Sequence, residues 1–106
     1  MWLFLYGTLL AADRWRALTG RELVGAPAAL AGWRRVCLRG TLYPTLARDR
    51  GRVSGLLVRA DPGMLRRLAV YEGARYRLRR VGVRCRGRTV AAHAWIGDAP
   101  TRRQWP

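Results

Sequence analysis

One carboxylate lies at a helix position where an apolar side chain is expected. Residues 61–72 predict a helix whose apolar face is defined by Leu65, Leu68 and Ala69 through their i, i+3, i+4 spacing. The next position on that face is Glu72. A carboxylate placed there would be buried in the last turn of a helix, where it is suited to acid–base chemistry.

The predicted surroundings of Glu72 favour its neutral form. Burial disfavours a charged carboxylate and raises its pKa. The C-terminal end of a helix is the negative end of the helix dipole, which acts in the same direction. A glutamate with a raised pKa can accept and return a proton near neutral pH. The alternative is that the last turn frays and Glu72 points into water; the spacing alone leaves both open.

A second feature is the apolar run near the start of the sequence. Trp2–Tyr6 is apolar or aromatic without interruption, which is typical of a strand buried on both faces, although periodicity does not exclude a buried helix. Gly7 ends the run and Thr8 follows it. Such an end leaves backbone N–H groups and one hydroxyl at the edge of the core, where a ligand can bind. An ordinary turn after a central strand is the simpler interpretation.

The elements between these two features are predicted from local signals. In chain order we expect a short helix over Leu9–Leu18 with Gly20 as its stop, a loop over residues 19–30, an extended segment over Leu30–Leu38, a turn over Arg48–Arg52 and a strand over Val53–Val58. Pro44 cannot donate to a ladder, so Tyr43-Pro44 is expected at a strand edge or turn. Gly55 indicates a bulge or a close backbone approach.

The second half of the chain is predicted as a helix followed by a hairpin. Asp61-Pro62 is typical of a helix N-terminus, and Gly73 of a C-terminal stop. Val81, Val83 and Cys85 alternate with polar residues or glycine, which predicts a half-buried strand. Gly87 is expected in a turn, and Thr89–Ile96 is expected to form the second strand of the hairpin. His93 is the single histidine; it is expected to face away from the core, in a structural or solvated role.

Composition bounds the class of protein. The 106 residues suit one domain, which we place at residues 1–98, with an irregular C-terminal tail at 99–106. No transmembrane run or signal peptide is present, which favours the cytoplasm. Cys37 and Cys85 lack the spacing of a metal site, so we expect no metal and free thiols. Nothing in the pattern specifies an oligomeric state.

The net charge of +15 raises the question of a nucleic-acid partner. All 21 cations are arginine, and alanine and glycine are also plentiful, which indicates a coding bias. The densest run spans Arg77–Arg88. A basic patch favours nucleic acid, whereas the lack of a recognised nucleic-acid motif argues against it, so this partner is not expected but stays open.

Several short motifs stand in a characteristic order. They are Leu-Tyr-Gly-Thr-Leu at residues 5–9, Gly-x-x-Tyr-Pro at 40–44, Val-x-Gly-Leu at 53–56, Tyr-Glu-Gly-x-x-Tyr-Arg at 71–77, Val-x-Val at 81–83 and Ala-x-Ala-Trp at 92–95. In this order the chain resembles the γ-glutamylcyclotransferase-like family, which includes small bacterial members and plant avirulence-induced proteins. The resemblance covers almost the whole chain, from Trp2 to about Ile96.

The resemblance implies a fold and a reaction. The fold would be α+β: a small mixed domain with a curved, barrel-like sheet, one or two short helices and a cavity at its mouth. The reaction would cyclise a γ-glutamyl amide to 5-oxoproline and release a free amine, without a cofactor. Glu72 aligns with the family's catalytic glutamate. The substrate-binding residues would be Tyr6, Gly7, Thr8 and Leu9, joined by Tyr43 and Tyr76 in the cavity wall.

Two departures from the family pattern bear on activity. Members usually carry Leu-Asp three residues before the catalytic glutamate, where this chain has Ala69, and often Arg-Arg after the tyrosine, where the second residue here is Leu78. Both could alter the hydrogen bonds at the helix end. Two alternatives therefore stay open beside the enzyme: a non-catalytic small-molecule binding domain of the same fold, and a basic nucleic-acid-associated domain that uses Arg77–Arg88.

Overall fold

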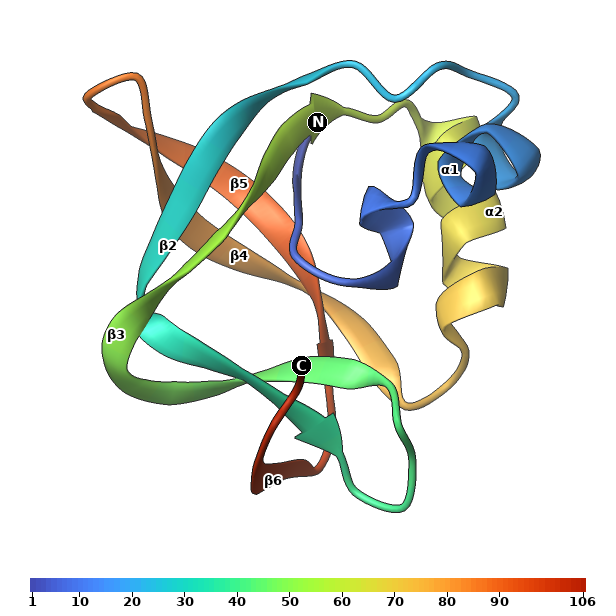
Figure 1. The fold of residues 1–106 in the computed structure, drawn as a ribbon. Helices are drawn as coiled ribbons and strands as arrows, with labels where there is room; N and C mark the ends of the chain where they lie inside the picture. Colours follow the sequence, from blue (N-terminus) through green and yellow to red (C-terminus); the bar gives the residue numbers. More distant parts are fainter.

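The structure is a closed β-barrel with two short helices packed against its outside (Figure 1). It is a computed structural model that describes residues 1–106. The strands are β1 (Trp2–Leu5), β2 (Gly25–Leu38), β3 (Pro44–Arg59), β4 (Tyr76–Cys85), β5 (Arg88–Gly97) and β6 (Pro100–Gln104). The two helices are α1 (Ala12–Thr19) and α2 (Pro62–Glu72), and a 3₁₀ turn, η1 (Thr8–Leu10), precedes α1. The expected α+β class and barrel-like sheet are confirmed.

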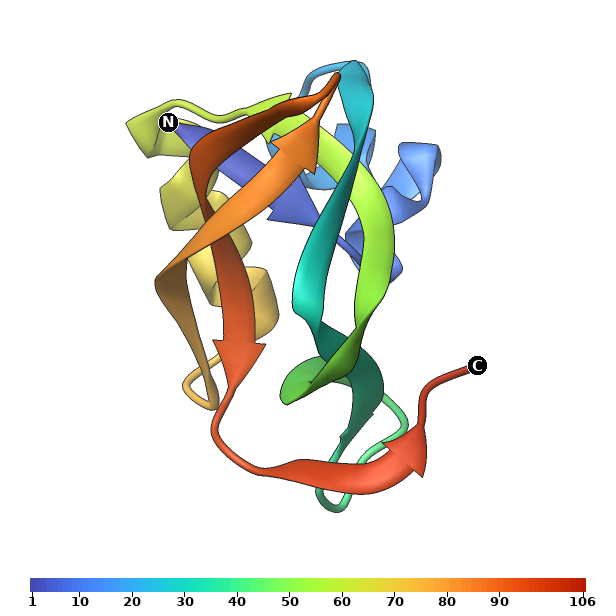
Figure 2. The same cartoon turned by 90° about the vertical axis from the view of Figure 1, so that its left-hand side faces the viewer.

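The barrel closes because the long strands β2 and β3 pair with each other as well as with the rest of the sheet. The sheet order is β3-β1-β5-β4-β2-β6, and the additional β3–β2 pairing completes a ring of five strands. Strand β1 runs antiparallel to β3 and parallel to β5. Strand β6 lies outside the ring, against β2 (Figure 2).

Strand β1 is buried on both faces, as the apolar run predicts. Phe4 belongs to the cluster of side chains that fills the barrel. Leu3 and Leu5 belong to a second cluster, which packs the barrel wall against the helices and includes Trp15 and Leu68. The end of β1 therefore lies between the barrel interior and the helical layer.

Helix α2 begins and ends where its local signals predict. Asp61 caps the first turn, with its Oδ1 accepting the Met64 N–H at 2.9 Å. Gly73 follows the last residue and donates its N–H to the Ala69 carbonyl. The predicted apolar face needs one correction: Met64 and Leu68 are its buried residues, whereas Ala69 is exposed. Met64 and Leu68 pack in the cluster that contains Trp15 of α1 and side chains of β1.

The single helix expected over Leu9–Leu18 is wrong in its first part. The chain forms η1 and then α1, and the two are separated by Ala11, whose backbone is extended. The stop is correct, since Gly20 ends α1 with a φ of 72°.

Two segments expected to be a loop and a turn belong to long strands instead. β2 already begins at Gly25, inside the expected loop over residues 19–30. Arg48–Arg52 continues β3, because its two flanks pair with the same strand: Arg48 opposes Trp33 and Arg52 opposes Ala31. The polar residues between them form an irregularity in the ladder. Across the two strands, the Arg48 guanidinium lies over the Trp33 ring, 4.5 Å from its centre.

The C-terminal half contains the predicted hairpin and one further strand. Val83 and Cys85 face the barrel interior, and Arg86-Gly87 forms the two-residue turn. The tail at residues 99–106 is expected to be irregular; instead β6 forms there, because the edge of β2 at Val36 and Leu38 is free to pair with it. Gly55 approaches the Leu5 carbonyl so closely that any side chain would collide. No helix of the chain is long and apolar enough to cross a membrane.

Candidate active site

A small cavity opens where β1 and α2 both end. Its volume is about 170 Å³. The structure brings all seven predicted site residues to its wall: Tyr6, Gly7, Thr8, Leu9, Tyr43, Glu72 and Tyr76. The other lining residues are Phe4, Leu5, Pro44, Tyr71 and Trp95. The cavity is thus mostly aromatic and apolar, and Glu72 is its one charged side chain.

Glu72 is held in this cavity without a cationic partner. It makes no hydrogen bond and no ion pair, although the chain has 21 arginines. Four of the six acidic side chains are ion-paired elsewhere on the surface. Helix α2 extends through Glu72, so the last turn does not fray. Burial raises the pKa of Glu72 to about 7, which makes both protonation states accessible near neutral pH.

The loop after β1 passes unusually close to the start of β3. A Cβ atom on Gly7 would lie 2.6 Å from Pro44 Cγ, a separation that no side chain tolerates. Arg35 Nη1 donates to the Tyr6 carbonyl at 3.1 Å, which ties the start of this loop to β2. No side chain caps the turn η1. Gly7, Thr8 and Leu9 line the cavity, and N–H groups at the start of a helical turn have no intrahelical partner.

Three tyrosine hydroxyls join the segments that form the cavity wall. Tyr6 Oη donates to the Trp95 carbonyl, and Tyr76 Oη donates to the Pro44 carbonyl at 2.6 Å. Tyr71 Oη and Thr8 Oγ1 share a hydrogen bond of 2.9 Å, which joins α2 directly to the loop after β1. Burial, followed by the charge of Glu72, raises the pKa of Tyr76 to about 12, so this hydroxyl stays protonated.

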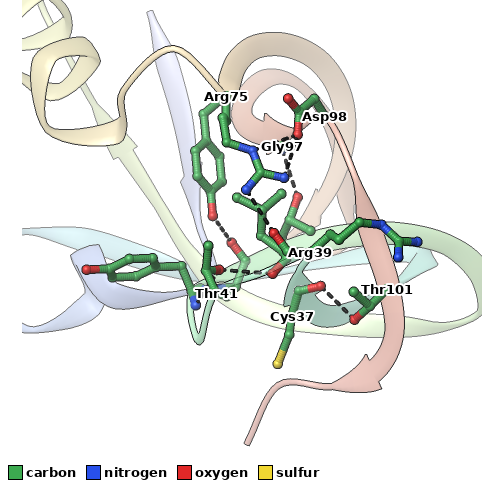
Figure 3. Close-up of polar contacts among 12 residues, drawn as sticks. Cys37, Arg39, Thr41, Arg75, Gly97, Asp98 and Thr101 are labelled. Carbon is green, nitrogen blue, oxygen red and sulfur yellow. Dashed lines mark hydrogen bonds and ion pairs between the residues drawn. The ribbon is translucent and has the colours of Figure 1, made fainter.

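Arg75 ties the segment after α2 to the segment before β3 (Figure 3). Its Nη1 donates to the Arg39 carbonyl at 2.8 Å, and its Nε and Nη2 contact Asp98 Oδ1, each at 3.1 Å. Beside it, the Gly97 N–H donates to Thr45 Oγ1 at 2.8 Å. These contacts fix the cavity rim relative to the end of β5.

Sequence reasoning missed Tyr71 and Trp95. Tyr71 immediately precedes Glu72, and Trp95 ends the Ala-x-Ala-Trp motif, so adjacency and motif were the available signals. The two departures fall outside the cavity. Ala69 is exposed and Leu78 packs against the cluster beneath the helices. The Gly73 N–H still donates to the Ala69 carbonyl, so the last turn of α2 forms without the family's aspartate.

The other candidate groups lie away from the cavity. His93 is half-buried on β5, in register with Leu3, and does not line it. The six arginines between residues 77 and 88 are exposed, and none lines the cavity. No three His, Cys, Asp or Glu side chains gather into a possible metal site.

Fold and cavity together define a class: a small α+β barrel whose cavity combines one unpaired carboxylate with a backbone loop. The sequence matches the family described as gamma-glutamyl cyclotransferase, AIG2-like, over residues 3–105. The chain therefore belongs to this family, and the resemblance noted in its sequence is confirmed.

Solved structures with the same fold include a plant protein and an enzyme. A solution structure of an Arabidopsis thaliana protein is 26% identical to this chain, with a TM-score of 0.79. The match includes 91% of this chain and 61% of the plant chain. A gamma-glutamyl cyclotransferase is 16% identical, with a TM-score of 0.83, and 95% of this chain covers 68% of it. YkqA from Bacillus subtilis is 19% identical, with a TM-score of 0.83, and 97% of this chain covers 42% of it. Comparison with curated proteins gave no match.

Proposed function

We propose that this protein cyclises a γ-glutamyl amide to 5-oxoproline and releases a free amine, with Glu72 as general acid and base. One observation carries the proposal: an unpaired carboxylate with a pKa raised to about 7 shares a cavity with the backbone loop Tyr6–Leu9. Membership of the gamma-glutamyl cyclotransferase, AIG2-like family supports this class of reaction.

The substrate supplies its own nucleophile in this reaction. Its α-amine attacks the γ-carbonyl carbon, and Glu72 accepts the proton that the amine loses as the ring C–N bond forms. N–H groups of Gly7, Thr8 and Leu9 donate to the substrate carboxylate and to the oxyanion that develops on the γ-oxygen. When the amide C–N bond breaks, Glu72 returns the proton to the departing amine. Intramolecular attack needs no enzymic nucleophile and no cofactor.

The test is 5-oxoproline release from a panel of γ-glutamyl amides and γ-glutamyl amino acids. We expect Glu72→Gln to lower kcat by about 10² to 10⁴, the usual contribution of a general acid or base. Glu22→Gln is the matched control, because Glu22 is an exposed carboxylate paired with Arg16. Equal rates for wild type and Glu72→Gln would refute the assignment.

The same panel separates the enzyme from a binding domain. A rise in melting temperature with 5-oxoproline or a γ-glutamyl amide, together with no product from any substrate, would indicate a binding domain that lacks turnover.

A further inference from the structure

One tyrosine of the cavity differs from the other three. Tyr6, Tyr71 and Tyr76 each bond their hydroxyl to another part of the wall. Tyr43 also lines the cavity, but its hydroxyl has no partner within the protein and the residue is 60% exposed. Its ring therefore stands between the cavity and solvent, where it can contact a ligand that extends outward.

The backbone that carries Tyr43 is fixed on several sides. The Tyr43 carbonyl accepts the Leu38 N–H at 2.8 Å, and its own N–H donates to Thr41 Oγ1 at 3.0 Å. Trp105 Nε1 donates to the Leu42 carbonyl at 3.0 Å. Arg75 holds the Arg39 carbonyl at 2.8 Å (Figure 3). An aromatic ring on so well-anchored a loop is preorganised, which lowers the entropic cost of binding to it.

The cavity is small for a whole γ-glutamyl conjugate. Its volume of about 170 Å³ lies below the roughly 300–1,000 Å³ typical of sites for drug-sized ligands. With the glutamyl group against Glu72 and the loop Tyr6–Leu9, the departing amine must extend to the rim. The rim residue with an unengaged side chain is Tyr43.

We propose that Tyr43 forms a subsite for the leaving amine and selects amines that carry an aromatic or apolar group next to the reacting amide. This inference rests on the proposed function and adds the substrate class. An aromatic ring gains energy from a stacked or edge-on partner ring beyond the area that it buries. The net charge of +15 disfavours the approach of a substrate whose leaving group carries an additional positive charge.

The test compares γ-glutamyl benzylamide with γ-glutamyl methylamide. In wild type we expect kcat/KM to favour the benzylamide, and Tyr43→Ala to lower the benzylamide-to-methylamide ratio about 10-fold. Tyr43→Phe should retain the ratio, because the ring and not the hydroxyl makes the contact. Leu42→Ala is the matched control: Leu42 is 74% exposed on the same loop but lines the separate hollow beside Cys37, so the ratio should not change.

Binding to the Glu72→Gln variant separates this inference from the proposed function. Calorimetry gives the affinities of both amides without turnover, and the same preference for the benzylamide should appear and be lost in Glu72→Gln/Tyr43→Ala. Absence of 5-oxoproline with any amide would refute the proposed reaction while the binding preference still supports the subsite. Product formation with no preference, or with the best rate for a cationic 4-aminobutylamide, would overturn the subsite.

Discussion

At the scale of single residues, the proposed reaction depends on what surrounds Glu72. A carboxylate among arginines would be held ionised, and then it could not act as an acid near pH 7. The cavity contains no arginine, so burial alone determines the pKa of Glu72. The hydroxyls of three neighbouring tyrosines are engaged with the wall and do not bond to Glu72 either. The carboxylate is therefore left without a partner in the protein, as the proposed reaction requires.

Burial of Glu72 should also make stability depend on pH. Its pKa is raised from 4.5 to about 7 in the folded protein. Below pH 4.5 the group is protonated in both states; as the pH rises to about 7, the unfolded chain loses a proton that the folded protein keeps, so the wild type loses stability. We expect Glu72→Gln to gain on the order of 3 kcal/mol over wild type between pH 4.5 and pH 8.

Denaturant unfolding of both proteins at the two pH values measures this difference. The variant shares every other titratable group with the wild type. Its own change in stability with pH therefore gives the contribution of those other groups. A constant difference between the two proteins across this range would show that Glu72 is not buried in the folded state.

At the scale of elements, the site depends on how the exit from α2 is joined to the start of β3. Arg75 and Tyr76 follow α2 closely and bond to the carbonyls of Arg39 and Pro44. The loop that carries Tyr43 is therefore fixed to the same segment that positions Glu72. Movement of one would move the other.

Removing the Arg75 side chain should loosen this loop without unfolding the barrel. Arg75→Ala loses the bond to the Arg39 carbonyl, so we expect amide exchange at Leu38 and Arg39 to accelerate roughly 2- to 10-fold, as for one net hydrogen bond. Asp98→Asn is the matched control, because it weakens the exposed ion pair but keeps the bond to Arg39. Equal acceleration in both variants would mean that the ion pair, and not the bond to Arg39, holds the loop.

At the scale of the whole molecule, the barrel closes without its last strand. The β3–β2 pairing completes the ring, and β6 adds to the outer edge of β2. The C-terminal segment nevertheless contacts the rest of the protein, since Thr101 Oγ1 donates to the Cys37 carbonyl at 2.8 Å and Trp105 to that of Leu42. We therefore propose that residues 1–98 form the folding unit and that the remainder stabilises it.

Deleting residues 99–106 tests this proposal. We expect the truncated chain to keep its barrel but to lose about 2–4 kcal/mol of stability, as for a few hydrogen bonds. The Cys37 thiol should react faster with a thiol reagent, because it is buried and lies against the Gln104 carbonyl of β6. Cys85, buried inside the barrel, is the internal reference. A truncated chain that does not fold would show that residues 99–106 belong to the folding unit.

The sequence by itself determined the features whose signals are local. The cap at Asp61-Pro62, the stops at Gly20 and Gly73 and the turn at Gly87 depend on a few neighbouring residues and are present in the structure. The order of short motifs was enough to indicate the family, because the motifs extend over nearly the whole chain. The role of Glu72 stays a prediction for the assays above.

Only the tertiary structure decided which of these residues meet. Thr8 and Tyr71 lie 63 positions apart, and closure of the barrel against α2 brings their hydroxyls together. Arg48–Arg52 is strand and not turn because β2 pairs with both of its flanks, which no local pattern records. The same closure leaves Glu72 without a cation and Tyr43 without a partner for its hydroxyl. Burial and pairing at long range are properties of the packed chain, and they distinguish the tyrosines of the wall from the tyrosine of the rim.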